Sequence, residues 1–399
     1  MTADRGVDLA GTAPPAHAAE RDPALDGVRG LAMLMVLLVH GFTPKPTGLP
    51  TQLVHNLFES MFVAVDLFFV LSGFLITSIL IRTRSSEGYL RNFYWRRVLR
   101  ISPAYLIVMF GCFVLLPLFT EPQVAQALHG VALAHLLYVQ NLVAALHGPM
   151  PAGVSHFWSL AIEEQFYLLW PLTVLLVPLR RLPWVCAAVF AASCLCKLVL
   201  YLSGASWLML YVFTPCHVEG LAAGAWIAAN RQIRGVLSVP RWLKLVGAPA
   251  ATGLLLLAVF NSSVKLFDPT QLVLHNILGT VAFTWLMYSL VAVQAPAALR
   301  WLFNSRVLRT LGTYSYGIYL IGWELVLHIQ YPLARRLTVL MSDNLALLCS
   351  GIAVAALNIA LAMLMFHAVE KPLLGFKDRG PGRRREPAAA AAARPGETA

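Results

Sequence analysis

The chain has 399 residues, of which 58% are hydrophobic and only 12% are charged, a balance that excludes an ordinary soluble domain and indicates a polytopic membrane protein. The formal net charge of +11 is spread over short loops between apolar runs, so it indicates membrane topology and we expect no nucleic-acid partner. The six cysteines show no Cys-x-x-Cys or zinc-type spacing, so we expect neither a disulfide framework nor a metal site.

The two ends of the chain differ in composition from the rest. Residues 1–24 are rich in Ala, Pro and charges of both signs and lack a basic segment followed by a cleavage site, so we expect a disordered cytoplasmic terminus without a cleaved signal peptide. Residues 376–399 carry three consecutive arginines and an alanine tract, and we expect a disordered cytoplasmic tail. Between them, residues 25–375 are predicted to form one all-α membrane domain.

Apolar runs follow one another along this domain, and most are long enough to span a bilayer. One run, 131–147, is short and contains four polar residues. If it lies at the outer surface without spanning, most of the 30 Lys and Arg residues fall on one side of the membrane. We therefore predict a bundle of about ten transmembrane helices with both termini in the cytoplasm. The runs are 27–43, 57–81, 101–119, 131–147, 157–178, 184–202, 206–229, 245–260, 272–294, 310–330 and 345–369.

The first run, LDGVRGLAMLMVLLVHGF, contains Arg29 near its start and His40 near its end. At about 1.5 Å per residue the two lie roughly 16 Å apart along one helix, so they sit at different depths. Ionisable side chains inside a spanning helix are costly and commonly serve a pathway or a chemical step. The alternative is that Arg29 reaches the headgroups and His40 ends the helix.

Two further runs enter from the outer side and carry carboxylates. At helical rise, Asp66 lies about 12 Å and Glu163 about 10 Å below the outer surface, near the depth of His40. In the run HFWSLAIEEQFYLLWP, His156, Glu163 and Tyr167 share one helix face that can point into the bundle. The alternative is a hydrogen-bond network that only fixes helix packing.

The inner half of the membrane has a basic character. Ser72 and Gly73 lie deeper in the second run, where Gly73 permits close approach of another backbone or of a thin ligand. The segment RNFYWRRVLRISP then places several arginines at the inner interface, where they suit phosphate groups. An ordinary positive loop with an aromatic belt would look similar. Together with Arg29, Arg97 and Arg100 favour a phosphate-bearing donor that enters from the cytoplasm.

Five motifs occur in one order and spacing that resembles the acyltransferase type 3 family, integral-membrane enzymes that O-acylate sugars, surface glycans and some macrolide antibiotics. The motifs are LDGVRGLAMLMVLLVH, VDLFFVLSGFL, RRVLR, HFWSLAIEEQFYLLWP and YSYGIYL. The resemblance covers roughly residues 24–374. It implies a bundle of about ten helices, an acyl-coenzyme A donor, most often acetyl-coenzyme A, and location in the plasma membrane.

The resemblance also implies roles for individual residues. Arg29 and His40 match the family's Arg-x10-His pair, Arg97 and Arg100 match its Arg-x-x-Arg pair, and Glu163 matches the first glutamate of its HxWSLxxE stretch. Two positions depart from the family pattern: Gly322 replaces a late histidine, and His217 stands where an arginine is expected. Both departures lie where an acceptor would be contacted, whereas the nearby acid Glu219 is retained.

These observations lead to a hypothesis for the reaction. Acyl-coenzyme A binds to Arg29, Arg97 and Arg100 and passes Ser72 and Gly73, His40 acts as general base, and Glu163 or Asp66 orients it. We assign acceptor binding to His156, Tyr167 and Glu219. A covalent acyl-enzyme on Ser72 or Ser159 is less favoured, because neither serine lies in a nucleophile-elbow motif.

The expected partners are a small-molecule or glycan acceptor and membrane lipid, with no metal involved. The alternative function is a multi-pass transporter or flippase without acyl-transfer chemistry, which consumption of acyl-coenzyme A would distinguish.

Overall fold

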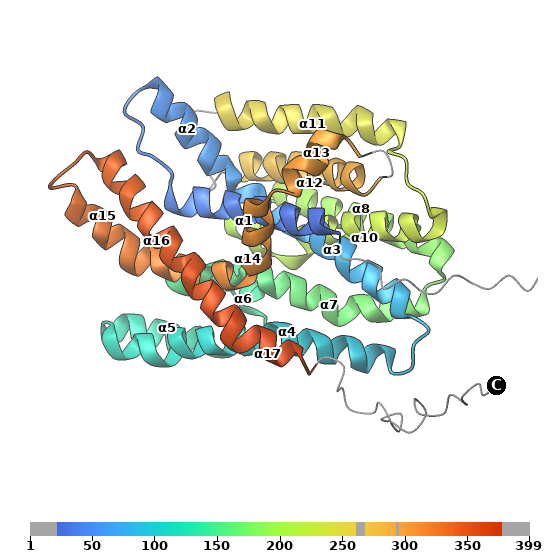
Figure 1. Ribbon diagram of the computed structural model, residues 1–399, viewed down its shortest axis with the longest axis horizontal. Helices are drawn as coiled ribbons and strands as arrows, with labels where there is room; N and C mark the ends of the chain where they lie inside the picture. The colour runs from blue at the N-terminus through green and yellow to red at the C-terminus, as the bar shows by residue number, and fades with distance from the viewer. Residues whose placement is uncertain (1–21, 261–267, 293–294, 377–399) are drawn as a thin grey trace, which may run out of the picture.

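The computed structural model describes residues 22–260, 268–292 and 295–376, and the regular secondary structure in these ranges is helical throughout. Most of the long helices lie alongside one another in a bundle (Figure 1). This arrangement confirms the all-α prediction for the described residues. The predicted terminal segments 1–24 and 376–399 fall almost entirely outside the described residues.

The first part of the chain supplies the helices that surround the candidate site. α1 begins at Pro23, where the Asp22 carboxylate accepts a hydrogen bond from the Ala24 amide (3.0 Å) and the proline occupies a position that needs no N–H partner. The helices are α1 (Pro23–Gly41), α2 (Leu49–Glu59), the 3-10 turn η1 (Ser60–Val63), α3 (Ala64–Thr83), α4 (Tyr89–Phe110), the π-helical η2 (Gly111–Leu115) and the 3-10 turn η3 (Leu116–Phe119).

The middle of the chain alternates short and long helices. They are α5 (Pro122–Leu136), α6 (Gln140–His147), the 3-10 turn η4 (Ala152–Phe157), α7 (Trp158–Leu176), η5 (Leu179–Arg181), α8 (Leu182–Leu202), α9 (Trp207–Val212), η6 (Thr214–Cys216) and α10 (Val218–Arg234). The run 131–147 is divided between α5 and α6, and Tyr138 between them has a positive φ of 53°. It is therefore not one continuous spanning helix.

The last part completes the bundle with α11 (Arg241–Phe260), α12 (Pro269–Val291), α13 (Ala297–Phe303), α14 (Arg306–Leu325), the π-helical η7 (Val326–Gln330), α15 (Tyr331–Leu337), α16 (Asp343–Met365), the π-helical η8 (Phe366–Glu370) and α17 (Lys371–Leu374). In Figure 1, α16 crosses the bundle obliquely, and α15 lies beside it at one end.

Seven helical segments among the described residues are long and apolar enough to cross a membrane, which supports a multi-pass membrane protein. They are Pro23–Gly41, Leu49–Thr83, Tyr89–Phe119, Leu179–Leu202, Arg241–Phe260, Pro269–Val291 and Asp343–Leu374.

Close backbone contacts hold two helix pairs together. A Cβ added at Gly30 in α1 would lie 1.8 Å from the Leu308 carbonyl oxygen of α14, and one added at Gly73 in α3 would lie 1.9 Å from the Leu221 carbonyl oxygen of α10. Small residues permit this spacing in helix bundles, and any side chain would force the helices apart. The α1–α14 and α3–α10 pairs thus fix where α1 and α3 present Arg29 and Ser72.

A polar cluster fills the bundle between α3, α8, α10 and α12. The Lys197 ammonium lies 2.5 Å from Glu219 Oε1, and Ser193 donates to Glu219 Oε2 at 2.6 Å. Asn276 donates to Asp66 Oδ2 at 3.0 Å. All of these side chains are almost completely buried, so their partners replace the water that they lose.

Candidate active site

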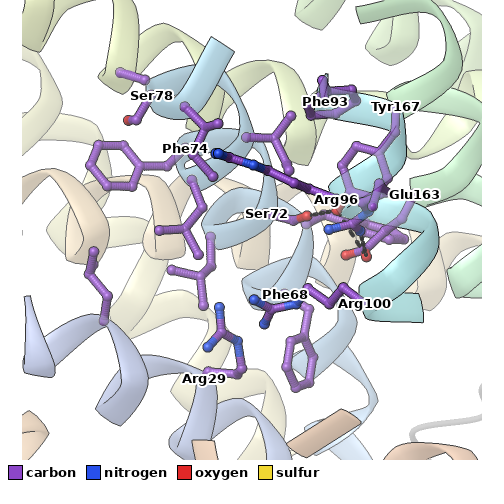
Figure 2. A pocket seen from close by; sticks show the side chains of 18 of the residues that line it. Arg29, Phe68, Ser72, Phe74, Ser78, Phe93, Arg96, Arg100, Glu163 and Tyr167 are labelled. Carbon is purple, nitrogen blue, oxygen red and sulfur yellow. Dashed lines mark hydrogen bonds and ion pairs between the residues drawn. The ribbon is translucent and has the colours of Figure 1, made fainter. Parts of the chain in front are cut away.

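A cavity of about 1490 Å³ extends into the bundle between α1, α3, α4, α7 and α14. Figure 2 shows Arg29, Arg96 and Arg100 reaching toward the same space, with Ser72, Glu163 and Tyr167 also on its wall. We call it the cationic cavity. Its lining includes seven arginines: Arg29, Arg82, Arg91, Arg96, Arg97, Arg100 and Arg231. This concentration of guanidinium groups suits an anionic ligand, since each offers planar hydrogen-bond donors to phosphate or carboxylate.

The α1 wall of this cavity carries Arg29. Its guanidinium donates to Asp26 Oδ1 at 3.0 Å, one helical turn away, and both side chains are only partly exposed. This pair orients the guanidinium along the cavity wall. The packing of α1 on α14 through Gly30 holds the whole segment in place.

On the opposite side, Arg97 of α4 reaches α7. Its guanidinium carbon lies 3.7 Å from the centre of the Tyr167 ring, and its nitrogens lie 3.8 Å from Glu163 Oε2 and 3.4 Å from Glu164 Oε1. Tyr167 donates to Glu163 Oε2 at 3.1 Å and is also hydrogen-bonded to the Ser72 hydroxyl. One cation, two carboxylates and two hydroxyls thus form one connected network at the cavity wall.

A second, small cavity of about 50 Å³ lies beside the first and contains both candidate histidines. We call it the histidine cavity. His40 lines it from the end of α1, with its ring 4.6 Å from that of Trp323, centre to centre, and His156 lines it from η4. Neither ring nitrogen of His156 makes a hydrogen bond of normal geometry within the described residues. Both imidazoles therefore line one small cavity.

The two cavities share three lining residues, Met33, Val36 and Tyr319, which therefore separate one from the other. The Tyr319 hydroxyl donates to the His156 carbonyl at 2.6 Å and is hydrogen-bonded to Ser159 at 3.1 Å. These bonds tie α14 to the start of α7. The cationic cavity and the histidine cavity are therefore adjacent at these three residues.

The structure brings together eight of the residues that the sequence singled out and separates three others. Gly73 contacts the α10 backbone, Asp66 is bound to Asn276, and Glu219 is paired with Lys197; none of the three lines either cavity. Glu163 is paired with Arg97, so the ion pair occupies the carboxylate that was expected to orient His40. The eight are Arg29, Arg97, Arg100, Ser72, Glu163 and Tyr167 in the cationic cavity, and His40 and His156 in the histidine cavity.

The two departures from the family motifs have different positions. Gly322 lines the histidine cavity, whereas the His217 ring packs among Phe69, Trp158 and Tyr211 and lies outside both cavities. His217 Nε2 lies 3.2 Å from the Leu210 carbonyl. Only the Gly322 departure is therefore placed beside the candidate site.

Several lining residues escaped the sequence argument. Arg82, Arg91 and Arg231 had the appearance of ordinary loop charges that set topology, because the sequence does not show that the two segments that contain them face one opening. A signal did exist for Asn358, which is an amide residue in the middle of the long apolar stretch of α16. It is 2% exposed and lines the histidine cavity.

The fold and the two cavities define an integral-membrane helical bundle in which an arginine-lined cavity lies next to a pair of histidines. The chain belongs to the acyltransferase type 3 family: the family model, described as an acyltransferase domain, matches residues 22–367. This match covers nearly all of the described residues and confirms the resemblance found from the five motifs.

Curated relatives carry related names. The chain is 29% identical to the peptidoglycan O-acetyltransferase OatA of Listeria monocytogenes, over 90% of this chain and 58% of that protein. It is 29% identical to the putative peptidoglycan O-acetyltransferase YrhL of Bacillus subtilis, over 88% and 54%, and 26% identical to the O-acetyltransferase OatA of Staphylococcus aureus, over 77% and 51%. The chain thus spans about half the length of these relatives. No solved structure matches it.

Proposed function

We propose that this protein transfers an acyl group, acetyl in the first place, from acyl-coenzyme A to a hydroxyl of a cell-wall glycan. The observation that carries the proposal is the adjacency of the arginine-lined cavity and the histidine cavity, which share the lining residues Met33, Val36 and Tyr319. Coenzyme A has a phosphate-rich end and a long thin arm that ends in the thioester. The two cavities suit these two ends.

The donor binds with its phosphates against the guanidinium groups of Arg29, Arg97 and Arg100 and its arm along the wall that carries Ser72. Arg97 is already held by two carboxylates and by the Tyr167 ring, so it contributes a fixed charge and does not swing freely. Fixed charges bind a ligand with less loss of side-chain entropy than mobile ones.

The chemistry is a direct transfer with His40 as the general base. His40 takes the proton of the acceptor hydroxyl, the hydroxyl oxygen attacks the thioester carbonyl, and the carbon–sulfur bond breaks. The departing thiolate takes up a proton and leaves as coenzyme A. We assign the binding of the acceptor hydroxyl to His156, which lines the histidine cavity together with His40.

The choice of a glycan acceptor is supported by the printed names of the relatives, two of which name peptidoglycan. The acceptor reaches the histidine cavity from the outer face of the plasma membrane, and the donor enters from the cytoplasm. In this topology α7, α10 and α14 also span the membrane, in addition to the seven apolar segments. That gives ten spans with both termini in the cytoplasm.

The test is acyl transfer in membranes from cells that express the chain, with acetyl-coenzyme A and peptidoglycan fragments supplied and the products analysed by mass spectrometry. We expect coenzyme A release and an acetylated fragment with the wild type and neither with His40→Ala. His129→Ala, at an exposed histidine of α5, is the matched control and should behave as the wild type. Macrolide acceptors are supplied in a parallel reaction.

Unchanged turnover in His40→Ala would contradict the role of His40. If acetyl-coenzyme A is not consumed under any condition while a solute moves across the membrane, the protein is a transporter and the proposed enzymatic function is wrong.

A further inference from the structure

The histidine cavity has a size and lining that fit one part of the proposed donor. Its volume of about 50 Å³ is roughly four times the minimum space that one water molecule requires. An acetyl group has three non-hydrogen atoms and fits such a space, whereas each further methylene of a longer chain needs additional room. A sugar ring is too large, so an acceptor can present only a hydroxyl at the edge.

The walls of this cavity are mostly apolar, with contributions from Met33, Leu37, Ile318, Val354 and Ala355. Apolar walls with a few placed polar groups are typical of sites that hold a small organic group. The cavity also begins at the three residues that it shares with the cationic cavity, which is where the end of the donor arm arrives. Its position and its lining therefore both suit the acyl end of the donor.

One wall consists of two residues in direct contact, Gly322 of α14 and Asn358 of α16. A Cβ added at Gly322 would lie 2.7 Å from Asn358 Nδ2, so a methyl group there has to displace the amide. Asn358 is 2% exposed, and its Nδ2 donates to the Ile318 carbonyl at 3.2 Å. Its Oδ1 has no hydrogen-bond partner within the described residues, and a buried methylene cannot supply one.

We propose that the histidine cavity is the acyl-group subsite and that Gly322 and Asn358 set the length of the acyl chain that the protein transfers. This inference rests on the proposed function, because it assigns a place to the acyl end of acyl-coenzyme A. The wall accepts acetyl and rejects longer chains because the space ends at these two residues.

The two residues allow a test with opposite outcomes. Asn358→Ala removes the amide and enlarges the cavity, so it should raise the use of butyryl-coenzyme A relative to acetyl-coenzyme A. Gly322→Ala pushes the amide into the cavity, so it should lower the use of propionyl-coenzyme A relative to acetyl-coenzyme A. A general packing defect would not move the two preferences in opposite directions.

The experiment measures kcat/KM for acetyl-, propionyl- and butyryl-coenzyme A in membranes that contain the full chain, with peptidoglycan fragments as acceptor. One methylene in an apolar pocket is worth about tenfold or more in specificity. We therefore expect each substitution to change its ratio at least about tenfold. Ser350→Ala in α16 and Gly253→Ala in α11 are the controls, since neither position lines the cavity, and their ratios should match the wild type.

The outcomes separate the two proposals. If the wild type consumes acetyl-coenzyme A but both variants keep the wild-type ratios within about twofold, the subsite assignment is wrong and the proposed function stands. If the wild type consumes none of the three donors, the proposed function fails and this inference fails with it. Where Asn358→Ala does not insert stably, the milder Asn358→Ser together with Gly322→Ala decides the question by the same ratios.

Discussion

Arg97 lies over the ring of Tyr167, with its guanidinium carbon 3.7 Å from the ring centre, and the same guanidinium is paired with Glu163 and Glu164. One cation thus contacts an aromatic ring and two carboxylates. A lysine cannot make this arrangement, because its ammonium is a compact charge without a planar face. The contact therefore depends on arginine in particular and not only on a positive charge.

The first prediction concerns this contact. Arg97→Lys should lower kcat/KM for acetyl-coenzyme A by at least about tenfold, because it loses the ring contact and the approach of one planar cation to both carboxylates. The measurement is steady-state coenzyme A release in membranes. Arg180→Lys, at an exposed position of η5, is the matched control and should show no change. Equal activity of the two variants would contradict a role for the guanidinium shape.

The second prediction concerns the α1 wall. Arg29→Gln should raise KM for acetyl-coenzyme A about tenfold, since a charge-assisted hydrogen bond contributes ~1.5–3 kcal/mol and part of that is screened at an open cavity. If Arg29 contacts the 3′-phosphate, the rise in KM should be smaller for acetyl-3′-dephospho-coenzyme A than for acetyl-coenzyme A. If it contacts the pyrophosphate, the rise should be equal for both donors. Arg335→Gln on α15 is exposed and serves as the control. An unchanged KM for both donors would remove Arg29 from the donor site.

The third prediction separates packing from ligand binding at Gly73. Gly73→Ala places a methyl group against the Leu221 carbonyl, so it should reduce the amount of folded protein and lower the thermal unfolding midpoint in detergent. Gly253→Ala, whose new Cβ would meet only Leu278 at 3.5 Å, should be tolerated. A normal unfolding midpoint with a raised KM for acetyl-coenzyme A would instead place Gly73 at the donor.

The fourth prediction concerns the buried pair Lys197–Glu219. Lys197→Met leaves the Glu219 carboxylate without its cation and should destabilise the fold by about 3–5 kcal/mol. Combining it with Glu219→Gln removes both charges and should restore much of that loss. Thermal or denaturant unfolding of the purified protein in detergent provides the measurement.

The same pair also tests the sequence-based assignment of Glu219 to acceptor binding. If the double variant folds normally but has a raised KM for the acceptor, Glu219 acts at the acceptor. An unchanged KM would assign it to packing alone.

Much of the site was accessible from the sequence because depth in a membrane can be counted along a helix. Arg29 and His40 lie on α1 as predicted, one at the arginine-lined cavity and one at the small cavity. The arginines at the start of α4 were expected to meet a ligand together with Arg29, and they line the same cavity. Both placements follow from helical rise and loop charge, which local sequence reports directly.

The sequence does not show in the same way which helices lie side by side at a given depth. Asp66 and Glu163 lie at similar predicted depths, but α3 turns Asp66 toward Asn276 of α12, away from the cavities. Which face of a helix meets which partner depends on the close contacts of Gly30 and Gly73 with distant carbonyls, and no local pattern reveals those partners. For the same reason, the sequence did not show that Gly322 and Asn358 lie next to each other on the wall of the histidine cavity.

The partition formed by Met33, Val36 and Tyr319 has a consequence for the cell beyond catalysis. A protein that receives a cytoplasmic substrate and acts on an extracellular one is at risk of becoming a leak for protons and sodium ions. Here the gap between the two cavities is bordered by a thioether, an isopropyl group and a tyrosine ring held by two hydrogen bonds. A hydrated ion has no replacement there for its water shell. In the proposed reaction a slender uncharged acyl end would pass such a seal, so acyl transfer would not require an open path for ions.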